Sequence, residues 1–516
     1  MTVMKSPGVY IVEKSAFPNS VVEVETAVPA FVGYTELADN RNTSLLKRPW
    51  RITSMAEYQQ YFGGPPAPRF EITEQAAHGD PVDFNANGKK YAVTPVAGTA
   101  GGRYGLYYAL RLFFQNGGGA CYVVSAGDYH QNVAAADLAA GLDELRTELE
   151  PTIVVIPEAV LLDQAQCVTL QQQMLSHCGQ EMKNRVAILD LWGGDKPRND
   201  PGGDPVAQFR DAIGTNNLQY AAAYYPWLNT TIVTDGDLSF ENISTLPELQ
   251  SLLRTELDLP ATKPAVPGDV QDRWQAVDSI TAAWTPGPHL TVAEIATNKR
   301  LLNQTLITIS PVFNTILGEI KRKLNLLPPS AAMAGIYTMI DNSRGVWKAP
   351  ANVSLSAVTS PSVPVSALEQ EDLNVTPQGK SINAIRAFAG EGVLVWGART
   401  LDGNSPDWRY INVRRTMIMI EESCRLAAKS CVFEPNVANT WVTIKIMIES
   451  FLTSFWKRGG LAGARPEDAF SVYVGLGETM TSDDMLEGIL RITVLVAIVR
   501  PAEFIELTWQ QQMQQS

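Results

Sequence analysis

The sequence predicts a multidomain fold that combines an α/β domain with an α+β domain. A chain of 516 residues has room for roughly three or four domains. Between residues 121 and 225, short apolar stretches alternate with longer amphipathic ones, as strands alternate with helices around a mostly parallel sheet. Both ends of the chain carry short alternating apolar runs, which are typical of strands that need a partner.

The C-terminal stretch contains two strand-like runs. Residues 489–499 are apolar and β-branched, and Pro501 prevents that strand from simply continuing. Residues 504–509 then alternate between two faces, with Phe504, Glu506 and Thr508 on one and Ile505, Leu507 and Trp509 on the other. A terminal strand either pairs within its own domain or crosses to a neighbouring copy.

The N-terminal stretch has the same extended character. Two alternating runs lie at residues 9–12 and 21–24, and Phe17 and Pro18 separate them. They are interpreted either as a strand of the home domain or as an arm that pairs with another subunit. Residues 29–34 follow as a short buried strand.

The middle of the chain alternates between helices and strands. Residues 36–100 and 230–290 show little periodicity and are interpreted as insertions, the second with a helix near 246–257. Residues 354–368 are either a linker or a β-layer. The predicted helices are 103–115, 137–149, 164–181, 209–213 and 291–326 with a break at Pro311, and the predicted strands are 121–125, 153–156, 186–189, 220–225, 381–386 and 393–397.

Two strong amphipathic helices are predicted at residues 412–430 and 439–456, and Gly459 ends the second. Each carries a basic pair, Arg414 with Arg415 and Lys457 with Arg458. Such pairs are expected on solvated helix faces, or in contact with an acidic partner.

Motifs for catalysis or ligand binding are weak. Gly379-Lys380-Ser381 resembles the end of a phosphate loop, but Asn374 stands where that loop needs glycine. The four histidines and five cysteines have no zinc-type spacing, and Asp483 and Asp484 are better explained as a helix cap than as a cation site. The sequence predicts no cofactor and no metal and disfavours an enzyme. An α/β hydrolase or nucleotide-binding enzyme that uses the parallel sheet is the alternative.

Composition excludes several other classes. The net charge of −13 disfavours a general nucleic-acid binder. The N-terminus lacks the pattern of a secretory signal, and no apolar run reaches the roughly 20 residues of a membrane helix. The scattered cysteines are expected to be reduced thiols in a cytoplasmic product.

A series of short stretches runs along the chain: SPGVYIVE (6–13), TAVPAFVG (26–33), FFQNGGGACYVV (113–124), PPSAAMAG (328–335), GVWKAPAN (345–352), IN (382–383), VWGARTL (395–401), DWRYINVRR (407–415), FEPN (433–436) and RPAEF (500–504). In this order they resemble the contractile tail sheath family, found in phage tails, extracellular injection systems and pyocin-like particles. Residues 36–100 and 230–290 lie outside the resemblance.

The resemblance implies a sheath-type fold. Both chain ends would form an inner α+β domain, beside a middle α/β domain with variable outer insertions. The implied boundaries are 1–28 for an N-terminal linking arm, 29–120 for the start of the core with the insertion at about 36–100, 121–326 for the middle domain with the insertion at about 230–290, 327–370 for a sheath segment and linker, and 371–516 for the inner domain with its terminal linking strand.

The resemblance also implies a function. Sheath subunits stack as hexameric rings around an inner tube and contract to drive it through a cell envelope. The implied partners are further copies of the chain, the inner tube protein, and baseplate and terminal cap proteins, with no direct contact to nucleic acid and no stable membrane insertion. Assembly would occur in the cytoplasm, as part of a phage tail or a tail-like particle. A tail tube subunit is disfavoured by the length of the chain.

Carried onto this sequence, the resemblance assigns two sets of residues. The inter-subunit strands are Val9, Tyr10, Ile11, Val12, Val21, Val22, Val24, Phe504, Ile505, Glu506, Leu507 and Trp509. The tube-facing set is Arg414, Arg415, Lys457 and Arg458.

Overall fold

The computed structural model describes residues 21–75, 81–265, 267–284 and 291–507, and these residues form two compact units. Within this range, unit 1 comprises residues 21–26, 344–349 and 412–507. Unit 2 comprises the remaining described residues, from Ala27 to Ser343 and from Pro350 to Ile411. Unit 1 therefore combines segments that lie far apart in the sequence.

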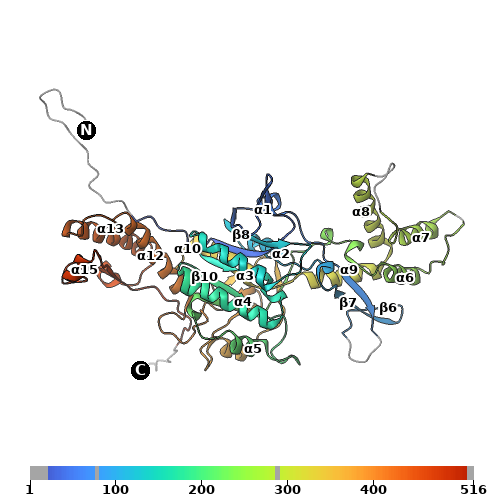
Figure 1. The fold of residues 1–516 in the computed structure, drawn as a ribbon. Coiled ribbons are helices and arrows are strands. Elements are labelled where there is room, and N and C mark those ends of the chain that lie inside the picture. The colour runs from blue at the N-terminus through green and yellow to red at the C-terminus, as the bar shows by residue number, and fades with distance from the viewer. Residues whose placement is uncertain (1–20, 76–80, 266, 285–290, 508–516) are drawn as a thin grey trace, which may run out of the picture. The chain divides into compact units, whose positions relative to one another are not determined.

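A nine-stranded mixed sheet forms the centre of unit 2 (Figure 1). The six inner strands are mutually parallel, as the alternation of strands and helices predicted, and antiparallel strands flank them on both sides. In spatial order the strands are β14 (Val353–Ser354), β17 (Gly392–Val395), β16 (Asn383–Phe388), β11 (Ala221–Tyr225), β10 (Val186–Asp190), β9 (Ile153–Val155), β1 (Pro29–Thr35), β8 (Cys121–Asp128) and β4 (Trp50–Ile52).

Helices cover both faces of this sheet. The ring of Phe31 in β1 lies 5.1 Å from the ring of Phe113 in α2 (Leu106–Gln115). Its neighbour Val32 packs so closely on Gly141 of α3 (Ala135–Glu144) that a Cβ at Gly141 would lie 2.6 Å from Val32 Cγ1. Because successive side chains of a strand point to opposite faces, α2 and α3 lie on opposite faces of the sheet.

Most helices of unit 2 lie in or close to the predicted ranges, including the break at Pro311, but the helices at Met55–Phe62, Asp269–Ser279, Ser330–Arg344 and Ala367–Asn374 were not predicted. The helices of unit 2 are α1 (Met55–Phe62), α2 (Leu106–Gln115), α3 (Ala135–Glu144), α4 (Gln164–Ser176), α5 (Pro205–Ala212), α6 (Leu246–Glu256), α7 (Asp269–Ser279), α8 (Val292–Ile309), α9 (Pro311–Leu324), α10 (Ser330–Arg344) and α11 (Ala367–Asn374).

Residues 36–100 hold more regular structure than their weak periodicity indicated. Their strands are short: β4 pairs with the distant strand β8, and the others pair with nearby residues, so no window of sequence is long enough to show a period. Residues 358–361, predicted as a linker or a β-layer, form a strand of a small sheet. The small sheets are β2 (Asp39–Asn40) with β3 (Thr43–Ser44); β5 (Phe70–Glu74), β7 (Lys89–Pro95) and β6 (Phe84–Ala86); and β13 (Leu326–Leu327), β12 (Leu228–Thr230) and β15 (Val358–Pro361).

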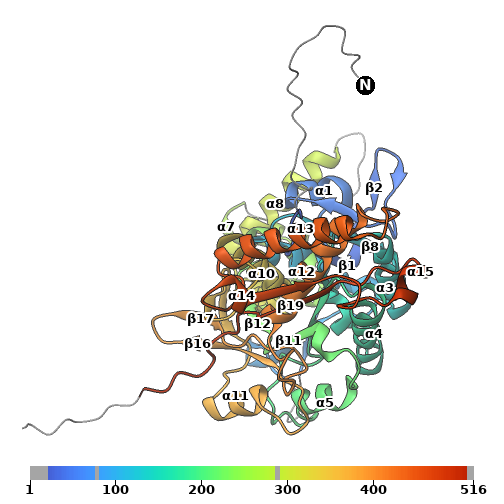
Figure 2. The same ribbon diagram turned by 90° about the vertical axis from the view of Figure 1, so that its left-hand side faces the viewer.

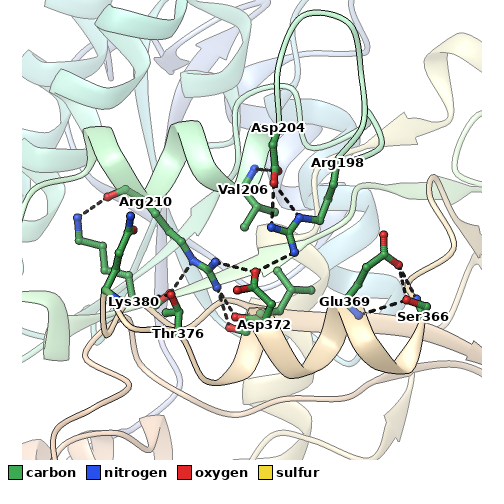
Figure 3. Close-up of polar contacts among 11 residues, drawn as sticks. Arg198, Asp204, Val206, Arg210, Ser366, Glu369, Asp372, Thr376 and Lys380 are labelled. Carbon is green, nitrogen blue, oxygen red and sulfur yellow. Dashed lines mark hydrogen bonds and ion pairs between the residues drawn. The ribbon is translucent and has the colours of Figure 1, made fainter.

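Two arginines hold α11 against the α5 region (Figure 3). One carboxylate oxygen of Asp372 accepts from Arg198 at 2.8 Å and from Arg210 at 2.9 Å. Arg210 is 4% exposed, and it also donates to the carbonyl of Lys380. Burial alone would raise the pKa of Asp372, but the two guanidinium groups outweigh burial and hold this pKa below its ordinary value.

Two buried carboxylates at the carboxyl ends of β9 and β10 anchor helices. Glu158 accepts from the backbone N–H groups of Gly105 and Leu106 at the start of α2, at 2.8 and 3.1 Å. Asp190 accepts from the N–H of Ser330 at the start of α10, at 2.8 Å. Burial raises the pKa of each carboxyl to about 7 against these hydrogen bonds.

The stability of the chain should therefore fall as the pH rises towards neutrality. Unfolded, these carboxyls titrate near 4.5 and 3.8; folded, they titrate near 7. Between these two pKa values the folded chain binds more protons than the unfolded chain. The free energy of unfolding therefore falls as the pH rises through this range, by on the order of 3 kcal/mol for Glu158. Denaturant unfolding of the unassembled chain at about pH 5 and pH 7.5 measures the loss. The variant Glu158→Gln should show a shallower pH dependence, and an unchanged one would contradict this account.

Candidate assembly site in unit 1

Two long helices form the core of unit 1. They are α12 (Ile411–Lys429) and α13 (Ala438–Lys457), close to the predicted ranges. The buried face of α13 follows helical spacing because its apolar side chains recur every three or four residues. These side chains are Ile444, Met447, Ile448, Phe451, Leu452 and Phe455. Gly459 ends the helix with a positive φ of 89°, as the sequence indicated.

A two-stranded antiparallel sheet packs on this helical core. It consists of β18 (Phe470–Tyr473) and β19 (Thr493–Val496). Val472, Val494 and Val496 contact the core, whereas Leu495 points away and is 56% exposed. The short helix α14 (Pro466–Ala469) directly precedes β18, and α15 (Ser482–Leu486) lies between the two strands in sequence. Asp484 closes the capping box of α15, as the cap interpretation predicted.

Neither edge of this sheet has a further strand within the described residues. The N–H of Ala497 donates to the carbonyl of Ala469 at 2.8 Å. This bond shows which residues of β19 direct their backbone groups towards β18. Because backbone groups alternate in direction along a strand, those of Val494 and Val496 point to the opposite, open edge of β19. Such an edge is a template for a strand from another chain.

The segment after β19 is extended (Figure 2). Residues 501–507 belong to no strand of the described chain. Phe504, Ile505 and Leu507 are 75%, 78% and 73% exposed. Three large apolar side chains left in water on one short segment indicate a surface that a partner covers. Trp509 of the same predicted strand lies outside the described residues.

The N-terminal run has a different environment. Val21 is buried in the core of unit 1, and the N–H of Val24 donates to Ser423 Oγ at 3.1 Å. Val22 between them is 78% exposed. The segment is extended but forms no strand in this chain, so its assignment as a linking strand stays a prediction. Residues 9–12 lie outside the described residues.

The expectation of a solvated helix face is wrong for Arg414 and Arg415. These side chains are 5% and 4% exposed. Arg415 donates to the carbonyl of Thr26 at 2.8 Å, and Arg414 pairs with Glu421 at 3.2 Å. The sequence pattern failed here because the start of α12 is covered by segments distant in sequence. Lys457 and Arg458 are exposed.

Asn412 is a structural residue that motif analysis did not single out. It is 1% exposed, and its side-chain amide donates to the carbonyls of Trp347, at 2.8 Å, and Val499, at 3.4 Å. It therefore ties the segment 344–349 and the chain after β19 to the start of α12. Its place within the stretch DWRYINVRR was the only signal in the sequence.

The described residues show no group of three or more His, Cys, Asp or Glu side chains arranged to hold a metal ion. Among the same residues, no helix combines the length and the apolar character that crossing a membrane requires. Glu158 and Asp190, the buried carboxylates at the sheet edge where α/β enzymes place catalytic groups, are engaged in anchoring helices.

Comparison with known proteins identifies the relatives of this arrangement. Residues 404–512, which span most of unit 1, match the phage tail sheath C-terminal domain. The helical sheath of the anti-feeding prophage (AFP) in its contracted state is 29% identical, with a TM-score of 0.59, over 99% of this chain and 100% of that one. The chain is a homologue of contractile tail sheath proteins. The sheath of an extracellular contractile injection system, PVC, in its contracted state is 26% identical, with a TM-score of 0.58, over 99% of each chain.

Similarity to curated sequences of tail sheath homologues is shorter. A prophage major tail sheath protein of Pseudomonas aeruginosa is 27% identical over 115 residues, which are 22% of this chain and 29% of that protein. The chain thus spans under a third of the length of that relative. The mixed α/β architecture of this sheath homologue, with its mixed sheet, matches the solved sheath chains.

Proposed function

We propose that this chain is a structural subunit of a contractile sheath, which polymerises as stacked hexameric rings around an inner tube. The observation that carries the proposal is the open-edged β18–β19 sheet, followed by an extended segment with three exposed apolar side chains. The similarity of the whole chain to sheath chains of contracted particles supports it.

Strand addition is the proposed link between subunits. The segment 501–507 of one copy, together with the run at residues 9–12, completes the β18–β19 sheet of neighbouring copies. Each added strand contributes several backbone hydrogen bonds of about 0.5–1.5 kcal/mol each. The chain on either side of an added strand bends as a hinge, so subunits rotate and move outward without separating.

Contraction then releases energy stored during assembly. The rings form around the tube in a metastable long state, and a signal from the baseplate lets them repack into a shorter, wider state. The change runs downhill between two arrangements of the same interfaces, so it needs no nucleotide. The tube is thereby driven through a target envelope.

The remaining assignments follow from this role. Unit 1 is the inner domain, and the described insertions of unit 2 form the outer part of the sheath. The partners are the inner tube protein and the baseplate and terminal cap proteins. The subunit is not an enzyme; it assembles in the cytoplasm and becomes part of a phage tail or a tail-like particle.

Negative-stain electron microscopy of the purified chain tests the proposal. A sheath subunit forms striated tubes, in a long and narrow or a short and wide state. An α/β enzyme, the alternative function, gives compact particles of uniform size. Compact particles at every concentration and salt condition, including with the inner tube protein present, would contradict the proposal.

A further inference from the structure

Arg458 lies where three separate stretches of unit 1 meet. Its guanidinium pairs with the carboxylate of Glu23. Its Cζ also lies 5.8 Å from the ring centroid of Trp347 and 5.5 Å from that of Phe455. Glu23 belongs to the N-terminal run, Trp347 to the segment 344–349, and Phe455 to α13.

Residues 21–26, the N-terminal strap, are fastened by side chains of α12 and α13. Ser423 accepts from the N–H of Val24, and Arg415 donates to the carbonyl of Thr26. No described strand forms a ladder with the strap. Val21 at the start of the strap is buried in the core of unit 1, and the pair of Glu23 with Arg458 is the ion pair beside it. Together, the core and Arg458 hold the end of the strap that follows residue 20.

An exposed ion pair alone is weak because two flexible side chains must be held in one geometry. The side chains of Arg458 and Glu23 are 46% and 32% exposed. Here the guanidinium is already positioned over two aromatic rings, which themselves pack edge to face with centroids 5.2 Å apart. Pre-positioning lowers the entropic cost of the pair, and a lysine would not reproduce the planar stacking.

We infer that Arg458 is a positioning residue for the N-terminal arm: with Glu23 it fixes the direction in which the arm leaves unit 1 towards a second copy of the chain. Arg458 thereby acts within its own subunit, and not as a contact to the inner tube. The inference rests on the proposed function, since an arm direction matters only in a polymer.

Charge reversal distinguishes a role of Arg458 in orienting the N-terminal arm from a direct contact of Arg458 to the inner tube. Glu23→Arg and Arg458→Glu each place like charges together, so each should raise the critical concentration for polymerisation about tenfold, equivalent to about 1.4 kcal/mol. The double variant restores an opposite pair and should return to within about threefold of the unmodified chain. Arg465→Glu makes the same charge change at an exposed arginine of unit 1 outside this contact and is the matched control, with an expected effect below about twofold.

Two patterns would overturn the inference. If Arg458→Glu impairs assembly, Glu23→Arg does not, and the double variant stays impaired, Arg458 contacts another molecule. If both single variants assemble like the unmodified chain, the pair does not orient the arm. Thermal unfolding of each unassembled variant shows that lost assembly is not lost folding. If the proposed function itself were wrong, the unmodified chain would form no tubes at all, which distinguishes that outcome from the two patterns above.

Discussion

Deletion of residues 504–516 is expected to abolish polymerisation and leave a folded monomer. The deletion removes Phe504, Ile505 and Leu507, which contact water in the single chain and which we expect to be buried in a neighbour. Loss of the added backbone hydrogen bonds and of this apolar burial costs about 5 kcal/mol or more per interface. That loss lowers the association constant by a factor of a thousand or more. Sedimentation velocity measures assembly, and thermal unfolding measures the monomer.

A shorter deletion is the matched control. Removal of residues 510–516 takes away only a polar, glutamine-rich tail and should leave polymerisation unchanged. If the longer truncation assembled as well as this control, residues 504–509 would have no linking role. If it failed to fold, the segment would belong to the core of its own subunit, contrary to its exposure.

The variant Asp372→Asn should be the most destabilising single change that we predict for unit 2. It removes the charge that two arginines share and leaves the buried Arg210 guanidinium without its ion partner (Figure 3). Removing one partner of a buried pair costs about 3–5 kcal/mol. Because the side chain of Asp372 is 42% exposed, we expect about 2–3 kcal/mol here. Denaturant unfolding of the unassembled chain measures the loss.

Glu369→Gln on the same helix is the comparison for this variant. Glu369 closes the capping box with Ser366 at the surface, and replacing it should cost only about 0.5–1 kcal/mol. As the pH falls below about 3.8, the stability difference between the unmodified chain and Asp372→Asn should shrink, and it should vanish once the pH passes the lowered pKa of Asp372 in the folded chain, because protonation removes the charge that the arginines share. A smaller loss for Asp372→Asn than for Glu369→Gln would show that the two-arginine contact does not stabilise α11.

The parts of the fold that follow from local periodicity could be predicted from the sequence. The parallel strands and α13 were predictable because their patterns extend over many residues and each end has a clear stop, such as Gly459. The short strands of residues 36–100 were not, because their partners decide them.

The candidate assembly site also has parts that could be predicted from local sequence patterns and parts that could not. The alternation in residues 504–509 indicated a strand that needs a pairing partner. In the structure, residues 501–507 belong to no strand among the described residues. The burial of Arg414 and Arg415 could not be predicted, because the segments that cover the start of α12 lie hundreds of residues away in sequence. The role of Ser423 depends on the same N-terminal segment, and that of Asn412 depends on Trp347 and Val499, which are 65 and 87 residues away in sequence.

The most direct test of strand exchange is a cryo-electron microscopy structure of the polymer formed by this chain. The account predicts that strands from other copies lie along the open edges of β18 and β19, with backbone N–O distances near 2.9 Å. It would be contradicted by a polymer in which residues 501–507 fold back on their own subunit and the edges beside Val494 and Val496 carry no strand from another copy.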